Sequence, residues 1–222
     1  MKRLLLGVSL IALFLTACQK AAPNLDDTFK TQPIDIPNEN EIDSNTLEAA
    51  SASLQIPYDA SLNISFNKEE FLKMVNEIRA KGAYCAPAAP PLRLNNYLET
   101  AAAAHAKDMA LHGFLGHIGS GTQTDPAKKA PGIGSYFMDR ILFFGYPAKS
   151  YDQVGENATL TKDKQNYKFP LKTHFKKALE LYVNDPPHCK ILLNPRFKDV
   201  GIGVYKSGKK YYWVMDLGEP PK

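Results

Sequence analysis

The chain has 222 residues, of which 27 are lysine or arginine and 23 are aspartate or glutamate, so its formal net charge is +4. It shows no internal repeat and no second globular domain, which excludes repeat architectures and a two-domain chain. This small net charge conceals an uneven distribution of charge along the sequence.

The first eighteen residues indicate the compartment. Residues 1–17 begin with basic side chains and continue with about a dozen apolar or small residues, too few to span a membrane and typical of an export signal. The end of this segment with Cys18 resembles the lipobox of bacterial lipoproteins, in which the cysteine is acylated. Gln19 stands where retained inner-membrane lipoproteins usually have aspartate. The resemblance implies a lipid-anchored protein of the bacterial cell envelope, at the outer membrane, whereas the alternative is an ordinary secretory signal.

Charge divides the rest of the chain into two parts. Residues 18–65 carry two basic and eight acidic side chains and no sustained hydrophobic periodicity, which predicts an acidic flexible tether. Residues 66–222 carry 23 basic and 15 acidic side chains, a net charge of +8, and are long enough for one domain. Such a basic domain suits anionic glycans or lipid headgroups, although solvated lysines are the plainer interpretation. The densest basic patch consists of Lys162, Lys164, Lys168, Lys172, Lys176 and Lys177, with Tyr167 and Phe169 between them.

Four helices are expected in this domain. The first begins after the N-cap residue Asn67, carries an apolar stripe and ends at Gly82. The second covers 96–111, where a run of alanines implies close packing against its neighbour. Shorter apolar patterns predict further helices over 135–144 and 171–184.

Strands are fewer and lie near the end of the chain. Apolar residues alternate over 200–204, a Ser-Gly turn follows, and 211–217 returns, which predicts an antiparallel hairpin. Residues 155–160 form a candidate third strand beside it. Four helices with a small sheet indicate a layered α+β domain.

Three short motifs carry a family resemblance. They are Gly116-His117, Gly155-Glu156-Asn157 and Pro186-Pro187-His188-Cys189. Together they resemble the bacterial branch of the CAP superfamily, which comprises cysteine-rich secretory proteins, antigen 5 and pathogenesis-related proteins. The resemblance covers about residues 68–218. It implies an α-β-α sandwich, in which about four helices flank a small antiparallel sheet, over the domain 66–222.

The resemblance also implies a cleft. His117 and His188 take the positions of the two cleft histidines, and Glu156 takes that of the cleft carboxylate. A fourth acidic residue completes the set in animal and plant members of the superfamily, and here both Asp185 and Glu180 are candidates.

The cysteines allow one internal pairing. If Cys18 carries lipid, only Cys85 and Cys189 remain, and in an exported protein we expect them to form a disulfide. Bacterial relatives resemble this pattern, with one cysteine after the first helix and one directly after the second histidine.

The cleft residues suit two kinds of chemistry. Two imidazoles and a carboxylate at 117, 156 and 188 could hold Zn²⁺ or another divalent cation and support hydrolysis. The same trio could instead form a buried polar network. No serine lies in a recognisable nucleophile elbow. Of the other histidines, we expect His105 to be a packing residue, and His112 and His174 to lie on the surface.

These considerations favour a binding protein over an enzyme. The expected ligand is a lipid, a glycan or a peptide, held in the His/Glu cleft with or without a divalent metal. A metal-dependent hydrolase and a structural or adhesive surface module are the alternatives. The membrane is an expected partner through the lipid anchor, nucleic acid is not, and the sequence leaves the oligomeric state open.

Overall fold

The computed structural model describes residues 64–220. The expected signal segment, Cys18 and all but the last two residues of the expected tether lie outside this range. The described elements are α2 Lys68–Lys81, β1 Arg93–Leu94, α3 Asn96–His112, α4 Phe137–Phe143, the 3₁₀ turn η1 Tyr151–Gln153, β2 Val154–Lys162, α5 Leu171–Asn184, α6 Pro186–Leu192, β3 Asp199–Ser207 and β4 Lys210–Gly218. None of the helices in this range has the length and apolar composition that a membrane crossing requires.

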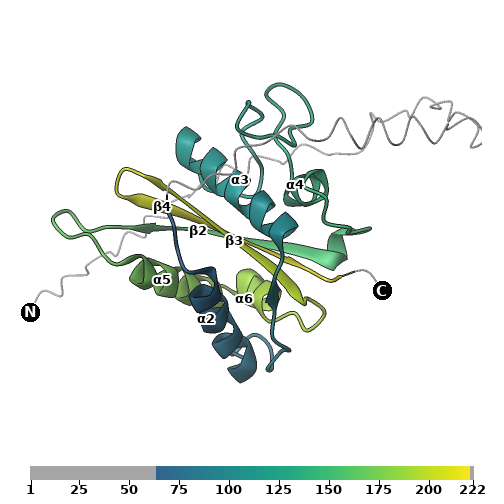
Figure 1. Ribbon diagram of the computed structural model, residues 1–222, viewed down its shortest axis with the longest axis vertical. Helices are drawn as coiled ribbons and strands as arrows, with labels where there is room; N and C mark the ends of the chain where they lie inside the picture. Colours follow the sequence, from purple (N-terminus) through teal and green to yellow (C-terminus); the bar gives the residue numbers. More distant parts are fainter. Residues whose placement is uncertain (1–63, 221–222) are drawn as a thin grey trace, which may run out of the picture. The chain divides into compact units, whose positions relative to one another are not determined.

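The four strands form one sheet in the order β1-β3-β4-β2 (Figure 1). β3 and β4 pair as an antiparallel hairpin, and β2 pairs antiparallel with the other edge of β4, so the predicted hairpin and third strand are confirmed. The short strand β1 runs parallel to β3 and makes the sheet mixed, whereas the expectation was an antiparallel sheet. Two residues carry no periodic signal, which is why the sequence did not indicate β1.

Helices cover both faces of the sheet, as expected for an α-β-α sandwich. Figure 1 shows α3 and α4 on one face, and α2, α5 and α6 on the other. On the second face Phe71 of α2 stacks on Phe175 of α5 with ring centroids 4.1 Å apart, and Phe175 contacts Trp213 of β4 at 5.3 Å. The structure has five helices within residues 64–220 instead of about four, because the Pro-Pro turn begins a separate helix, α6.

The first face is held by an unusually close approach between α3 and β3. The alanines of α3 at positions 101–104 are all buried. Opposite them, a Cβ atom added to Gly203 would lie 2.4 Å from the backbone carbonyl carbon of Ala102, and one added to Gly201 would lie 2.0 Å from that of Leu98. The glycines of β3 and the alanines of α3 therefore act together, and the close packing expected from the alanines is observed.

Replacing Gly203 with alanine should destabilise the domain. The new methyl group meets helix backbone, which cannot rotate away, so we expect a loss of about 1–3 kcal/mol in the free energy of unfolding. Denaturant unfolding with the disulfide intact measures it. Gly116→Ala is the matched control, because a Cβ atom added there would have nothing within 4 Å. If Gly203→Ala lowers the free energy of unfolding no more than Gly116→Ala does, the close approach between α3 and β3 is contradicted.

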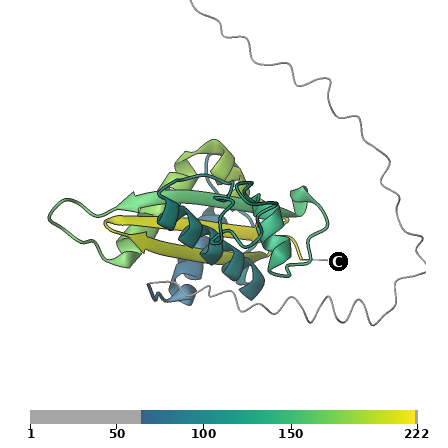
Figure 2. The same cartoon turned by 90° about the horizontal axis from the view of Figure 1, so that it is seen from above.

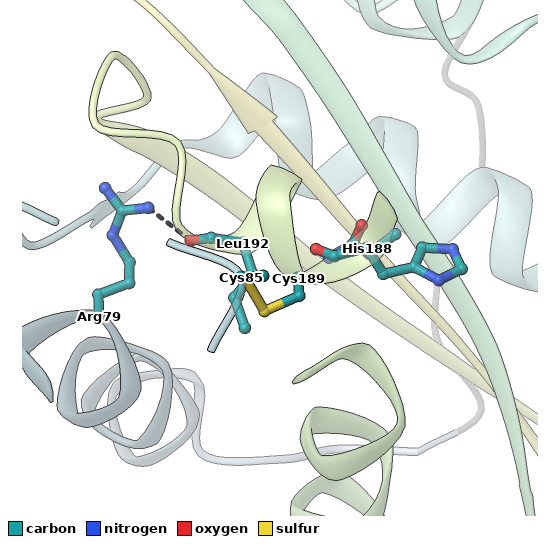
Figure 3. The surroundings of a disulfide bond; sticks show 6 residues. Arg79, Cys85, His188, Cys189 and Leu192 are labelled. Carbon is teal, nitrogen blue, oxygen red and sulfur yellow. Dashed lines mark hydrogen bonds between the residues drawn. A yellow bond between two sulfur atoms is a disulfide. The ribbon is translucent and has the colours of Figure 1, made fainter. Parts of the chain in front are cut away.

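A disulfide connects the loop after α2 with α6. Cys85 and Cys189 are bonded, as predicted, with their Cα atoms 6.1 Å apart. Figure 3 shows that the side chain of His188, one residue before Cys189, points away from the sulfur bridge. The disulfide therefore anchors α6 on one side of the helix, while His188 projects from another side.

Candidate functional site

Glu156 lies at the centre of the site, on β2, and is only 2% exposed. Its Oε1 accepts a hydrogen bond from Nδ1 of His117 at 2.9 Å. Its Oε2 accepts one from Nη2 of Arg140, in α4, at 2.7 Å. Both carboxylate oxygens are therefore engaged by side chains of the protein.

The charges around Glu156 decide its ionisation. Burial alone would raise the pKa of this carboxyl group, but the positive charge of Arg140 and the hydrogen bonds from His117 and Arg140 hold it below its usual range. Glu156 is thus ionised at neutral pH and can only accept hydrogen bonds. The proton in the bond to His117 must then sit on Nδ1, which leaves Nε2 of His117 without a proton when the ring is neutral.

Two buried side chains hold the backbone that carries His117. Arg140 donates from Nη2 to the carbonyl of His117 at 3.0 Å and from Nη1 to the carbonyl of Ser135 at 2.9 Å. His105, in α3, contacts the carbonyl of Gly116 through Nε2 at 2.7 Å. Burial lowers the pKa of His105, so its ring is neutral and Nε2 carries the donated proton. His105 was expected to be a packing residue, and it also positions the neighbour of His117.

His188 approaches from α6 on the other side. Its Nδ1 lies 2.5 Å from Oδ2 of Asp185. Its ring centroid lies 5.8 Å from that of His117 and 5.8 Å from that of Tyr182. Asn157 donates from its amide to the carbonyl of His188 at 3.1 Å, which links α6 to β2 beside Glu156. The three segments that carry the sequence motifs therefore meet in one place.

A second carboxyl group lies beside Glu156. Asp216 of β4 is its cross-strand partner and is fully buried. Burial, and then the negative charge of Glu156, raise the pKa of Asp216 well above its usual range. Asp216 is thus a neutral acid next to an ionised one, an arrangement that the sequence analysis missed. The sequence did contain a signal for this burial. Alternate residues of β4 face the same side of the sheet, so Asp216 lies on the same face as Tyr212 and Val214.

Two expectations from the sequence need correction. Glu180 does not join the cleft: it lines a groove between α2 and α5 and pairs with Lys177 at 3.2 Å. Asp185 is the acidic residue that contacts the second histidine. His174 is not on the surface: it is 3% exposed, and its Nε2 bonds to Asp163 at 2.9 Å.

The donor atoms limit how this site could hold a metal. Within residues 64–220, no group of three or more His, Cys, Asp or Glu side chains is arranged to bind one ion. Glu156 is therefore not placed as the third ligand that the sequence suggested, because it bonds to His117 and Arg140 instead. The two imidazoles of His117 and His188 remain, with Glu156 and Asp185 behind them.

Comparison with known proteins identifies the family of the chain. Residues 72–217 match the model of the cysteine-rich secretory protein family, CAP. The uncharacterized protein YkwD of Bacillus subtilis is 25% identical over 169 residues, which cover 75% of this chain and 54% of YkwD. The chain thus spans about half the length of this curated relative.

The solved structures that the chain matches are distant from it in sequence. An extracellular protein with an SCP domain from Bacillus anthracis has a TM-score of 0.46 and 21% identity, over 68% of this chain and 39% of that one. An outer surface protein of Borrelia burgdorferi has a TM-score of 0.46 and 15% identity, over 70% of this chain and 97% of that one. The family match covers most of the described domain, and the chain therefore belongs to the cysteine-rich secretory protein (CAP) family.

Proposed function

We propose that the domain binds a ligand of the cell envelope through Nε2 of His117 and Nε2 of His188. The observation that carries this proposal is the pairing of each imidazole with a carboxylate. Nδ1 of His117 bonds to Glu156, and Nδ1 of His188 lies against Asp185. A carboxylate at Nδ1 fixes the tautomer and leaves Nε2 to accept a hydrogen bond or to bind a cation.

The exposure of the two rings supports a binding role. The side chain of His117 is 46% exposed and that of His188 is 24% exposed, whereas Glu156 and Arg140 behind them are buried. The polar network thus presents two histidines to solvent on a rigid base. A network that served stability alone would need no such exposure. The ligand class is the one expected from the sequence, a lipid, a glycan or a peptide.

A divalent cation fits the donor set in part. His117 and His188 would hold it, and the remaining coordination positions would fall to water or to the ligand. When bound, a cation such as Zn²⁺ would act as a Lewis acid toward a ligand oxygen. Glu156 and Asp185 would orient the imidazoles and make them more basic. A hydrolase would use the same pair of histidines, and an adhesive module would need neither.

The proposed location is the bacterial envelope, with Cys18 acylated at the outer membrane. The export signal and lipobox-like cysteine in the sequence support it. The internal disulfide also suits an oxidising compartment. Mass spectrometry of the chain recovered from membranes would test the acylation directly.

Replacing both histidines should abolish binding at this site. The full chain and the variant His117→Ala with His188→Ala are titrated with ZnCl₂ by calorimetry, and then screened against lipids, peptidoglycan fragments and peptides. We expect zinc affinity to fall by more than about tenfold, since loss of the supporting carboxylates alone typically costs about 10–100-fold. Because the bond to Glu156 raises the pKa of His117, zinc affinity of the wild type should already begin to fall above pH 6.5 as the pH is lowered.

The control is His112→Ala, which removes an exposed histidine outside the site. Equal zinc affinity and equal ligand binding in the wild type and the double variant would overturn the proposal and leave the structural module. Another outcome is hydrolysis of an ester or peptide of the screen by the wild type. If a chelator stops this turnover and the double variant lacks it, the proposed function changes from binding to hydrolysis.

A further inference from the structure

A second concave surface lies away from the histidines, where α3 ends. Its volume is about 840 Å³, and it is lined by residues from three parts of the chain. These are the end of α3 at 110–113, the end of β2 with the residues that follow it, and the turn between β3 and β4. In both views this turn and the loop after β2 lie at the same end of the sheet (Figure 1, Figure 2). We call this surface the basic groove.

The charged side chains of the basic groove are mainly lysines. Lys162, Lys209 and Lys210 line it and are exposed. None of the three forms an ion pair with a carboxylate of residues 64–220, and Lys209 donates only to the carbonyl of Gln165. The lining has one acidic side chain, Asp163, which is 7% exposed and accepts hydrogen bonds within the protein. The groove therefore presents uncompensated positive charge to solvent.

Large exposed apolar side chains occur in the lining of the groove and in the two segments that continue from it. Leu111 lines the groove and is 53% exposed, and Leu115, four residues later, is 51% exposed. Tyr167, two residues after the lining residue Gln165, is 59% exposed, and its backbone forms an isolated β-bridge with that of Lys164. Exposed apolar side chains next to exposed lysines are the combination that interfacial membrane binding uses.

The basic groove is separate from the histidine site. Glu156 and Lys162 lie six residues apart on the extended strand β2, which corresponds to about 20 Å. A small ligand held at Glu156 would therefore not reach Lys162. The inference that follows is therefore independent of what His117 and His188 bind.

We propose that the basic groove, with the exposed apolar side chains of its lining and of the segments that continue from it, docks onto a membrane surface that contains anionic phospholipid. The lysines contact lipid phosphates, while Leu111, Leu115 and Tyr167 enter the interfacial layer. An acidic glycan would also neutralise the lysines, but it would leave the leucines in water. A lipid surface accounts for both kinds of side chain, and this decides between the two partners.

The test measures hydrogen exchange of the full chain reconstituted on vesicles. Vesicles of phosphatidylcholine alone are compared with vesicles that also contain phosphatidylglycerol. We expect slower amide exchange at 110–118, 162–170 and 206–210 on the anionic vesicles only, and loss of this protection in high salt. One lysine near an anionic surface changes membrane affinity by about fivefold. The variant Lys162→Gln with Lys209→Gln and Lys210→Gln should therefore lose the protection.

The matched control changes the same number of charges on α5, as Lys172→Gln with Lys176→Gln and Lys177→Gln. It should keep the protection, and both variants should keep the thermal unfolding temperature, because all six lysines are exposed. Identical exchange on the two kinds of vesicle, or equal loss in both variants, would overturn the proposal. Protection by dextran sulfate without protection by vesicles would assign the groove to an acidic glycan and would also overturn it.

Discussion

Replacing Arg140 with methionine should lower the free energy of unfolding by about 3–5 kcal/mol, because the change leaves the carboxylate of Glu156 buried without its cation. Arg140 is 1% exposed, and its guanidinium bonds to Glu156 and to the carbonyls of His117 and Ser135. Methionine fills a similar volume but satisfies none of these acceptors. Denaturant unfolding with the disulfide intact measures the loss.

Two further variants separate the charge from the packing. Arg140→Met with Glu156→Gln removes both charges, so the double variant should recover the part of the lost stability that is due to the unpaired carboxylate, while the carbonyls of His117 and Ser135 still lack their donor. Arg196→Met is the matched control, since Arg196 is about half exposed and its pairs with Asp152 and Glu219 should contribute less than about 1 kcal/mol. Equal losses for Arg140→Met and Arg196→Met would show that the buried pair does not support the site.

The architecture could be predicted because its signals are local. Asn67 caps α2 through a bond to the backbone of Glu70, and Gly113 ends α3, each where the sequence indicated. The hairpin of β3 and β4 follows from the alternation of apolar residues. The disulfide followed from the small number of cysteines, and the meeting of the cleft residues followed from the family motifs.

The supporting residues of the site could not be predicted in the same way. Asp216, for example, acts through its contact with a residue on another strand, and such a contact carries no periodic signal. From sequence alone, a charged residue is predicted to lie on the surface, unless the partner that compensates its burial is known. For His174, however, the sequence did contain evidence of burial. It lies four residues before Ala178 on the buried stripe of α5, so the helical period places it inward although its residue type suggests otherwise.

The same difficulty applies to Arg79, which is fully buried in the last turn of α2. Its guanidinium bonds to backbone carbonyls alone: Pro90 at 2.8 Å, Leu192 at 2.6 Å, Asn194 at 3.2 Å and Phe197 at 3.1 Å. Figure 3 shows the bond to Leu192 beside the disulfide. Leu192 ends α6, where helix carbonyls lack partners and carry partial negative charge. Arg79 therefore holds the end of the helix that presents His188.

Arg79→Met should lower the free energy of unfolding by at least about 3 kcal/mol, because each buried carbonyl left without a donor costs about 1–3 kcal/mol. Burial lowers the pKa of Arg79 to about 10, so the wild-type side chain remains charged at neutral pH. Arg79→Lys keeps that charge but cannot reach four carbonyls, and we expect it to lose nearly as much stability. Lys81→Met, an exposed change at the same helix end, should stay within about 0.5 kcal/mol of wild type. Full stability of Arg79→Lys would mean that charge, not the geometry of the guanidinium, holds α6 in place.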